Sequence, residues 1–195
     1  DHRSRLNEMY YAGKTPGKLN PTDVVDVTRA VMPRDTVVTA DVGSHKLLVG
    51  QGWTTYCPKG VLMSNGLSSM GYSLPAAMTA KMLMPQREIV CFTGDGGLAM
   101  VQGALRLAAS MKLGVKVRVL GDNTLNGVAL RQLAQQYPSS GTKIDPTDVV
   151  KLSQSMDCDS VEAHKIEELE AALTAAQASD RPLVIAAHID PAQYA

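Results

Sequence analysis

Short apolar runs alternate along the chain with longer segments in which apolar residues recur at helical spacing. The short runs, rich in β-branched residues, predict buried strands at 36–43, 60–66, 88–96, 115–123 and 181–189. The longer segments predict helices at 20–32, 68–84, 98–114, 146–156 and 165–179. Strands that are apolar throughout are buried on both faces. The pattern therefore predicts an α/β fold, a mostly parallel sheet flanked by helices on both faces.

The beginning of the chain differs from the rest. Residues 1–19 are polar and interrupted by glycine and proline, so we predict a linker or tail there, with a short helix at 3–12. A single domain is predicted over 20–195, with Asn20 as the N-cap of its first helix and Pro21 in the first helical position. Because the sequence starts with Asp1 rather than Met, we expect this start to be processed or cut from a longer chain.

Charge and composition narrow the classes of partner. The 19 basic and 19 acidic residues cancel, and only 4% of residues are aromatic, which argues against nucleic-acid binding. No apolar run reaches the roughly 20 residues that a membrane span needs. The three cysteines are far apart, have no metal-type spacing and are typical of a reducing compartment. No secretory signal is visible, so we expect a cytoplasmic protein that acts on a small molecule.

Polar residues stand at the carboxyl ends of four predicted strands. They are Asp41, Asn65, Asp95 and the pair Asp122–Asn123. Ligands of open parallel sheets bind beyond the carboxyl ends of the strands. We therefore expect these side chains to point toward one edge of the sheet and to mark the functional site.

Gly94-Asp95-Gly96 can be an ordinary turn, or it can be part of a site for a metal ion and a diphosphate. Between it and Asp122–Asn123 there is room for one helix and one strand, and a right-handed crossover would bring the two polar sites side by side. Carboxylate, amide and carbonyl oxygens suit Mg²⁺. Glycines also let the backbone approach a diphosphate. Counting residues leaves Asp122 and Asn123 open as the second ligand; we favour Asn123.

The pattern Gly-Asp-Gly, helix, strand, Asp-Asn-x-x-x-Gly resembles the diphosphate and metal motif of thiamine diphosphate (ThDP) enzymes. The resemblance covers about 20–195 and is closest to the C-terminal, diphosphate-binding domain of the acetolactate synthase family. "TADVGSHKLLVGQ", "MSNGLSSMGYSLPAAMTAK" and "DPTDVVKLSQSMDC" also resemble segments of that domain. No P-loop or Gly-x-Gly-x-x-Gly turn supports the alternative of an unrelated nucleotide-binding domain.

The resemblance implies a role for each matched residue. It implies that Asp95, Asn123 and the carbonyl of Leu125 ligate the metal. It also implies that Met70 lies under the bend of the cofactor. Backbone groups of Ser68 and Met70 meet the aminopyrimidine ring. The diphosphate is held by Ser44, His45, Gly94, Gly96 and Gly97.

The implied activity is the ThDP- and Mg²⁺-dependent decarboxylation of a 2-keto acid, followed by protonation or carboligation. No catalytic residue is expected in this chain, because in this family the activating Glu belongs to a separate pyrimidine-binding domain, usually of a neighbouring subunit. We therefore expect such a partner and a homo-oligomer. A catalytically inactive ThDP-binding scaffold or sensor remains an alternative, as does a stand-alone subunit of a sulfopyruvate- or phosphonopyruvate-type decarboxylase.

Overall fold

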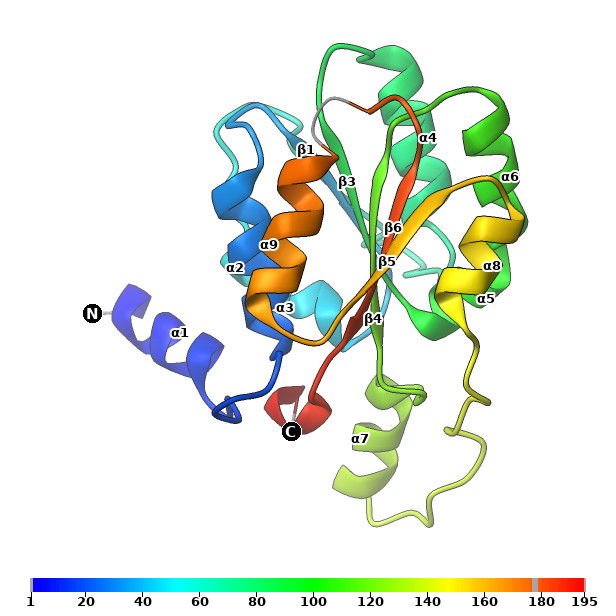
Figure 1. The fold of residues 1–195 in the computed structure, drawn as a ribbon. Helices are drawn as coiled ribbons and strands as arrows, with labels where there is room; N and C mark the ends of the chain where they lie inside the picture. The colour runs from blue at the N-terminus through cyan, green and yellow to red at the C-terminus, as the bar shows by residue number, and fades with distance from the viewer. Residues whose placement is uncertain (1, 177–178, 195) are drawn as a thin grey trace.

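A computed structural model describes residues 2–176 and 179–194. Its centre is a sheet in which every strand pairing is parallel, with the order β2-β1-β3-β4-β6-β5 (Figure 1). The strands are β1 (Val37–Ala40), β2 (Val61–Met63), β3 (Ile89–Gly94), β4 (Lys116–Gly121), β5 (Asp159–Ala163) and β6 (Leu183–His188). The predicted α/β fold with a parallel sheet is confirmed.

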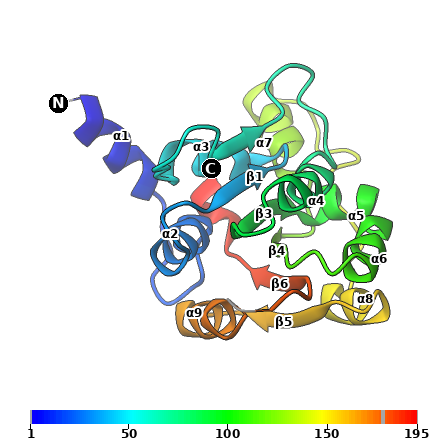
Figure 2. The same ribbon diagram turned by 90° about the horizontal axis from the view of Figure 1, so that it is seen from above.

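Helices cover both faces of the sheet, as Figure 2 shows. One layer contains α2 (Pro21–Val31), α3 (Ser44–Gly52) and α9 (Ile166–Ala175). The other contains α4 (Ser73–Leu83), α5 (Asp95–Val101), α6 (Gly103–Ser110) and α8 (Val149–Ser155). Beyond the carboxyl ends of the strands lie α7 (Asn126–Ala134) and the 3₁₀ helix η1 (Pro191–Tyr194), near the bottom of Figure 1.

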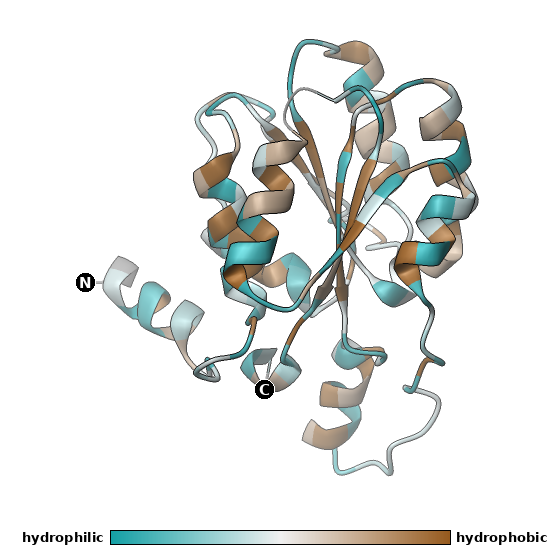
Figure 3. Cartoon of the chain, in the orientation of Figure 1, coloured by the Kyte–Doolittle hydropathy of each residue, from teal (hydrophilic) through white to brown (hydrophobic). Residues whose placement is uncertain are grey.

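The sheet carries the apolar core: strands such as β3 are largely hydrophobic, whereas the edge strand β5 contains hydrophilic residues (Figure 3). Phe92 and Ile185 are fully buried against the α2–α3–α9 layer, whereas Val117 is buried on the opposite face. Each such side chain contributes about 1.5–3 kcal/mol when it leaves water. Within the described ranges, no helix has the length and apolarity needed to cross a membrane.

Several predicted boundaries were wrong for local physical reasons. The predicted helix at 68–84 begins only at Ser73, because Ser68 and Gly71 have φ of 52° and 80° and so cannot be helical. The predicted helix at 98–114 is two helices that break at Gln102. The edge strand β5 was missed, since its exposed Asp159 and Glu162 leave little apolar signal. Of the predicted helix at 165–179, residues 177–178 lie outside the described residues.

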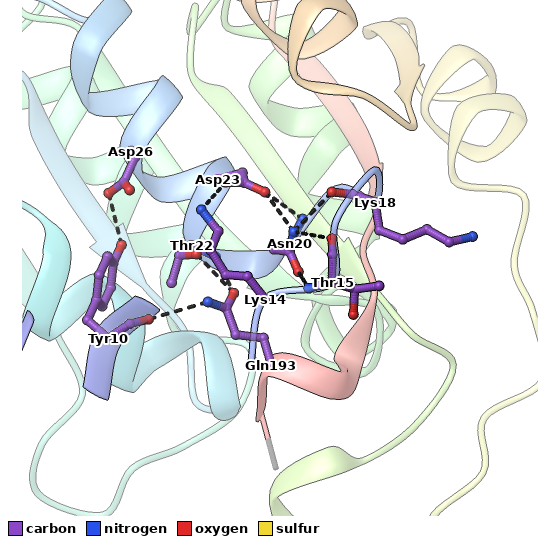
Figure 4. Close-up of polar contacts among 9 residues, drawn as sticks. All are labelled: Tyr10, Lys14, Thr15, Lys18, Asn20, Thr22, Asp23, Asp26 and Gln193. Atoms are coloured by element: carbon purple, nitrogen blue, oxygen red, sulfur yellow. Dashed lines mark hydrogen bonds and ion pairs between the residues drawn. The ribbon is translucent and has the colours of Figure 1, made fainter. Parts of the chain in front are cut away.

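The short helix predicted at 3–12 is present as α1 (His2–Tyr11). Polar contacts of Tyr10 attach the end of this helix to the domain (Figure 4). The Tyr10 hydroxyl donates to Asp26 at 3.1 Å, and the Gln193 amide donates to the Tyr10 carbonyl at 3.3 Å. Asn20 is the N-cap of α2, as predicted, and its N–H donates to Asp23 Oδ2 at 2.9 Å. The division into residues 1–19 and 20–195 stays a prediction.

Candidate functional site

The strand order reverses between β1 and β3, which makes this place the topological switch point of the sheet. After β1 the chain turns into α3 on one face of the sheet, and after β3 it turns into α5 on the other face. The two loops therefore diverge, which in open α/β sheets marks the usual binding position. The loop after β1 carries Ser44 and His45, and the turn after β3 carries Gly94-Asp95-Gly96-Gly97.

His45 lies in the first turn of α3, next to this switch point, and is buried. A Cβ atom added at Gly94 would lie 3.4 Å from its ring, and one added at Gly43 would lie only 2.7 Å away. Burial lowers the pKa of His45 to about 4, although the charge of Asp41 opposes that shift. The ring is therefore neutral at physiological pH. Its Nε2 atom is buried and has no hydrogen-bond partner among the described residues.

Asp41 has a positioning role. The sequence suggested that its side chain points to the open edge, but the carboxylate is fully buried. It accepts hydrogen bonds from the Gly71 amide at 2.9 Å, the Tyr72 amide at 3.3 Å and the Thr93 hydroxyl at 3.1 Å. A Cβ at Gly97 would lie 2.4 Å from Asp41 Oδ2, so this position requires glycine. Asp41 thus fixes the loop that carries Met70.

The Asp95 carboxylate faces the turn that follows β4. Asp95 is the first residue of α5, and the register of the neighbouring strands pairs Gly94 with Leu120. Its Oδ2 accepts hydrogen bonds from the Asn123 amide at 2.7 Å and the Asp122 amide at 3.2 Å. Its Oδ1 accepts one from the Gly96 amide at 2.8 Å. The predicted meeting of these two strand tips is therefore present in the structure.

Asp122 and Asn123 are used differently. The Asp122 carboxylate accepts hydrogen bonds from the Thr124 amide at 3.1 Å and from the Asn126 side chain at 2.9 Å. Burial raises the pKa of Asp122, and the nearby charge of Asp95 raises it further. Asn123 has a left-handed backbone, with φ of 54°, and is exposed. The Asp122 side chain is thus occupied by its own turn, whereas the Asn123 side chain is accessible.

Met70 and Leu125 meet over Gly96. A Cβ added there would lie 3.0 Å from Leu125 Cδ2, 3.1 Å from Met70 Cε and 3.1 Å from Ile144 Cδ1. The carbonyl of Leu125 accepts hydrogen bonds from the Val128 and Ala129 amides, which begin α7. These apolar atoms leave little room for a side chain at position 96, so glycine suits this position.

Ser68 belongs to a neighbouring polar group. The Lys46 ammonium donates to the Ser64 carbonyl at 2.5 Å and to the Ser68 hydroxyl at 3.4 Å. The contact ties the first turn of α3, which Ser44 begins, to the loop after β2. Lys46 and Ile144 were missed as parts of the site, and Ile144 had no signal in the sequence. Asp41 was expected there from its position after a strand, but its carboxylate is buried and holds the Met70 loop instead of facing the open edge.

Comparison with known proteins agrees with this geometry. The model of the protein family described as "Thiamine pyrophosphate enzyme, C-terminal TPP binding domain" matches residues 41–187, more than half of the chain. The chain belongs to this family. ThDP and thiamine pyrophosphate are two names for the same cofactor, so the resemblance inferred from the sequence is confirmed.

Acetolactate synthases are among its relatives. The chain is 32% identical over 176 residues to the acetolactate synthase large subunit of Parasynechococcus marenigrum (strain WH8102), covering 89% of this chain and 28% of the relative. It is 26% identical over 173 residues to acetolactate synthase of Bacillus subtilis (strain 168), covering 89% and 30%. The chain therefore spans about three tenths of the length of these relatives.

A solved structure supports the fold. The thiamine diphosphate-dependent 4-hydroxybenzoylformate decarboxylase of Rhodococcus jostii RHA1 superposes with a TM-score of 0.83 at 21% identity. The match covers 91% of this chain and 34% of the decarboxylase. At this sequence identity, the match shows that the two proteins share an α/β fold.

Proposed function

We propose that this chain binds the diphosphate of ThDP through Mg²⁺, as one part of an enzyme that decarboxylates a 2-keto acid. The observation that carries the proposal is the Asp95 carboxylate facing the 122–125 turn across adjacent strands, in a member of a thiamine pyrophosphate family. Acetolactate synthesis is the reaction that the relatives favour. When bound, ThDP supplies the electron sink that decarboxylation requires.

The polar groups fit a hydrated divalent cation. Asp95 supplies a charged oxygen and Asn123 an amide oxygen, which is the kind of ligand that Mg²⁺ prefers. Asn123 is the better second ligand, because its side chain is exposed beside Asp95, whereas the Asp122 carboxylate is held within its own turn by the Thr124 amide and the Asn126 side chain. The third expected ligand is the Leu125 carbonyl. Since this oxygen accepts bonds from Val128 and Ala129, its binding to the ion has to weaken the first turn of α7.

The switch point between β1 and β3 also offers groups for the diphosphate. Gly94, Gly96 and Gly97 place backbone close to the ion site, and Ser44 begins α3 on the opposite face of the sheet from α5. The buried, unpartnered Nε2 of His45 is a group that needs a partner, since an unsatisfied polar atom is costly to bury. As a neutral imidazole, His45 can donate from Nε2 to a phosphate oxygen.

The organic part of the cofactor is assigned to the loop after β2. Met70, held in place through Asp41, is the residue we assign to the bend of ThDP. Its unbranched, polarizable side chain suits close packing against a curved ligand. The backbone of Ser68 and Met70 is assigned to the aminopyrimidine ring.

The complete enzyme needs a pyrimidine-binding domain or subunit that brings the activating Glu. The chain spans only about three tenths of the relatives' length, and large apolar side chains are exposed on it, including Leu67 at 96% and Met100 at 64%. Exposed apolar surface of this kind favours association. We propose that the partner covers this surface and that the assembly contains at least two copies of this chain.

Calorimetric titration of ThDP at increasing Mg²⁺ tests the cofactor assignment. We expect saturable, Mg²⁺-dependent binding and a loss of at least about tenfold in affinity for Asp95→Ala, equivalent to about 1.4 kcal/mol. Asp122→Asn is the matched control and should retain Mg²⁺ dependence, because the Asn126 side chain can turn its unpartnered Oδ1 toward the new amide. An Asp95→Ala protein with unchanged Mg²⁺ dependence would show that the ion lies elsewhere.

A further inference from the structure

A cluster of two histidines and one glutamate lies at the carboxyl edge of β5 and β6, beyond the residues assigned to ThDP. Glu162 and His164 are two positions apart, so their side chains share one face of an extended segment. The parallel register pairs Glu162 with Ala186 and Ala163 with Ala187. Continued by one residue, this register sets His164 beside His188. The backbone of the sheet therefore brings the three side chains together.

The distances within the cluster are close to those of a metal site. The rings of His164 and His188 stack with centroids 4.3 Å apart and planes 3° from parallel. Glu162 Oε2 lies 3.3 Å from His164 Nε2 and 3.9 Å from His188 Nε2. One ligand atom from each residue lies within 4.8 Å of the others. In tetrahedral zinc sites, bond lengths of about 2.0–2.2 Å place neighbouring ligand atoms roughly 3.4 Å apart.

We propose that Glu162, His164 and His188 bind a divalent transition metal ion of the Zn²⁺ type, with water in the fourth position. Two imidazole nitrogens and one carboxylate oxygen suit Zn²⁺, whereas Mg²⁺ prefers oxygen ligands alone. This site is therefore chemically distinct from the one proposed at Asp95. It rests on its own residues and does not depend on the proposed function.

Small movements complete the coordination. Parallel rings cannot both direct their Nε2 atoms at one ion, so at least one imidazole has to tilt. The three side chains are about half exposed, at 52%, 55% and 50%, and tilting displaces no core residue. The backbone is already held, since the His164 amide donates to Glu168 Oε2 at 2.8 Å. Binding thus needs side-chain rotation and no change in the sheet.

The charge of a nearby lysine acts on the cluster. Lys151 interacts with Glu162 and is also paired with Asp148 at 2.8 Å. Metal binding replaces the exposed contacts between the imidazoles and Glu162, which are worth at most about 1 kcal/mol. An ion bound across β5 and β6 also fixes β5 to β6, the strand with which it pairs at the edge of the sheet.

Titration of chelator-treated protein with Zn²⁺ tests the proposal. We expect one saturable site, lost or weakened at least about tenfold in Glu162→Gln, His164→Gln and His188→Gln. Glu170→Gln, which changes an exposed carboxylate of α9 outside the cluster, is the matched control and should bind as the parent does. Co²⁺ should give the absorption bands of a tetrahedral site in the parent and not in His188→Gln.

Thermal unfolding provides a second readout. A ligand that binds only the folded state raises the melting temperature. Zn²⁺ should therefore stabilise the parent and Glu170→Gln, but not the three ligand variants, whose folding without metal is checked by circular dichroism. The proposal is overturned if Zn²⁺ shows no saturable binding to the parent protein. It is also overturned if the His188→Gln variant matches the parent both in Zn²⁺ affinity and in the rise of its melting temperature with Zn²⁺.

Discussion

Replacing Asp41 by Asn tests the claim that this buried carboxylate fixes the Met70 loop. Oδ1 accepts from the Val42 amide at 2.9 Å and the Tyr72 amide at 3.3 Å. Oδ2 accepts from the Gly71 amide at 2.9 Å and the Thr93 hydroxyl at 3.1 Å. Whichever oxygen becomes the Asn amide nitrogen, two donors lose their acceptor and face another donor.

The cost follows from the best arrangement that remains. The Thr93 hydroxyl has a second acceptor, the Gly94 carbonyl at 3.2 Å, and can turn toward it. The Asn nitrogen should therefore take the place of Oδ2 and leave the Gly71 amide unpaired. One unpaired buried donor costs about 1–3 kcal/mol, and the charge of the remaining acceptor is also lost. We expect Asp41→Asn to reduce the free energy of unfolding by about 2–4 kcal/mol.

Urea unfolding followed by circular dichroism measures this change, with an unaltered dependence on urea concentration showing that the unfolded state is comparable. Thr93→Val is the control: it removes one donor that has two acceptors, so it should cost no more than about 1 kcal/mol. An Asp41→Asn protein within about 0.5 kcal/mol of the parent would refute the positioning role.

Three further changes test other parts of the structure. Burial lowers the pKa of His45 to about 4, so unfolding takes up a proton between pH 4 and about 6.5. The free energy of unfolding should therefore fall by about 3 kcal/mol as the pH drops through that range. An equal loss in His45→Gln would contradict this reasoning. Arg118 is fully buried, and its guanidinium nitrogens have no hydrogen-bond partner among the described residues, so Arg118→Met should raise the free energy of unfolding by about 1–4 kcal/mol. A lower melting temperature for that variant would be the opposite result. Gly43→Ala should destabilise the folded protein by about 1–3 kcal/mol, because φ at Gly43 is 151° and the new Cβ meets the His45 ring. Gly127→Ala, in the open first turn of α7, is the control and should leave the stability unchanged. Similar melting temperatures for the two variants would argue against strain at Gly43.

The fold was largely predictable because burial on both faces makes the central strands apolar throughout. Cys91 and Val117 are completely buried and lie in runs that the sequence identifies as strands. The edge strand β5 lacks this signal, because it has one neighbour and exposes Asp159. The start of α4 was misplaced since the left-handed backbone of Ser68 has no clear signature in a serine.

The candidate site was predictable where a residue follows a buried strand. Asp95 and Asn123 were found in this way, and register brings them together. Contacts made by distant loops left no such signal. Ile144 lies near Gly96 because two loops pair with each other. In this pairing, the Ile144 amide donates to the Asn123 carbonyl, and the Leu125 amide donates to the Thr142 carbonyl. The hydrophobic periodicity of the sequence does not encode such a contact.

The most direct test of the proposed cofactor site is a crystal structure of this chain grown with ThDP and Mn²⁺, which shares the oxygen ligands of Mg²⁺ and is located by its anomalous signal. We expect the ion between the Asp95 carboxylate and the Asn123 side chain, with ligand distances of about 2 Å and the diphosphate bound to it. An ion held by Asp122 instead, or a diphosphate bound away from the 94–97 turn, would contradict the assignment.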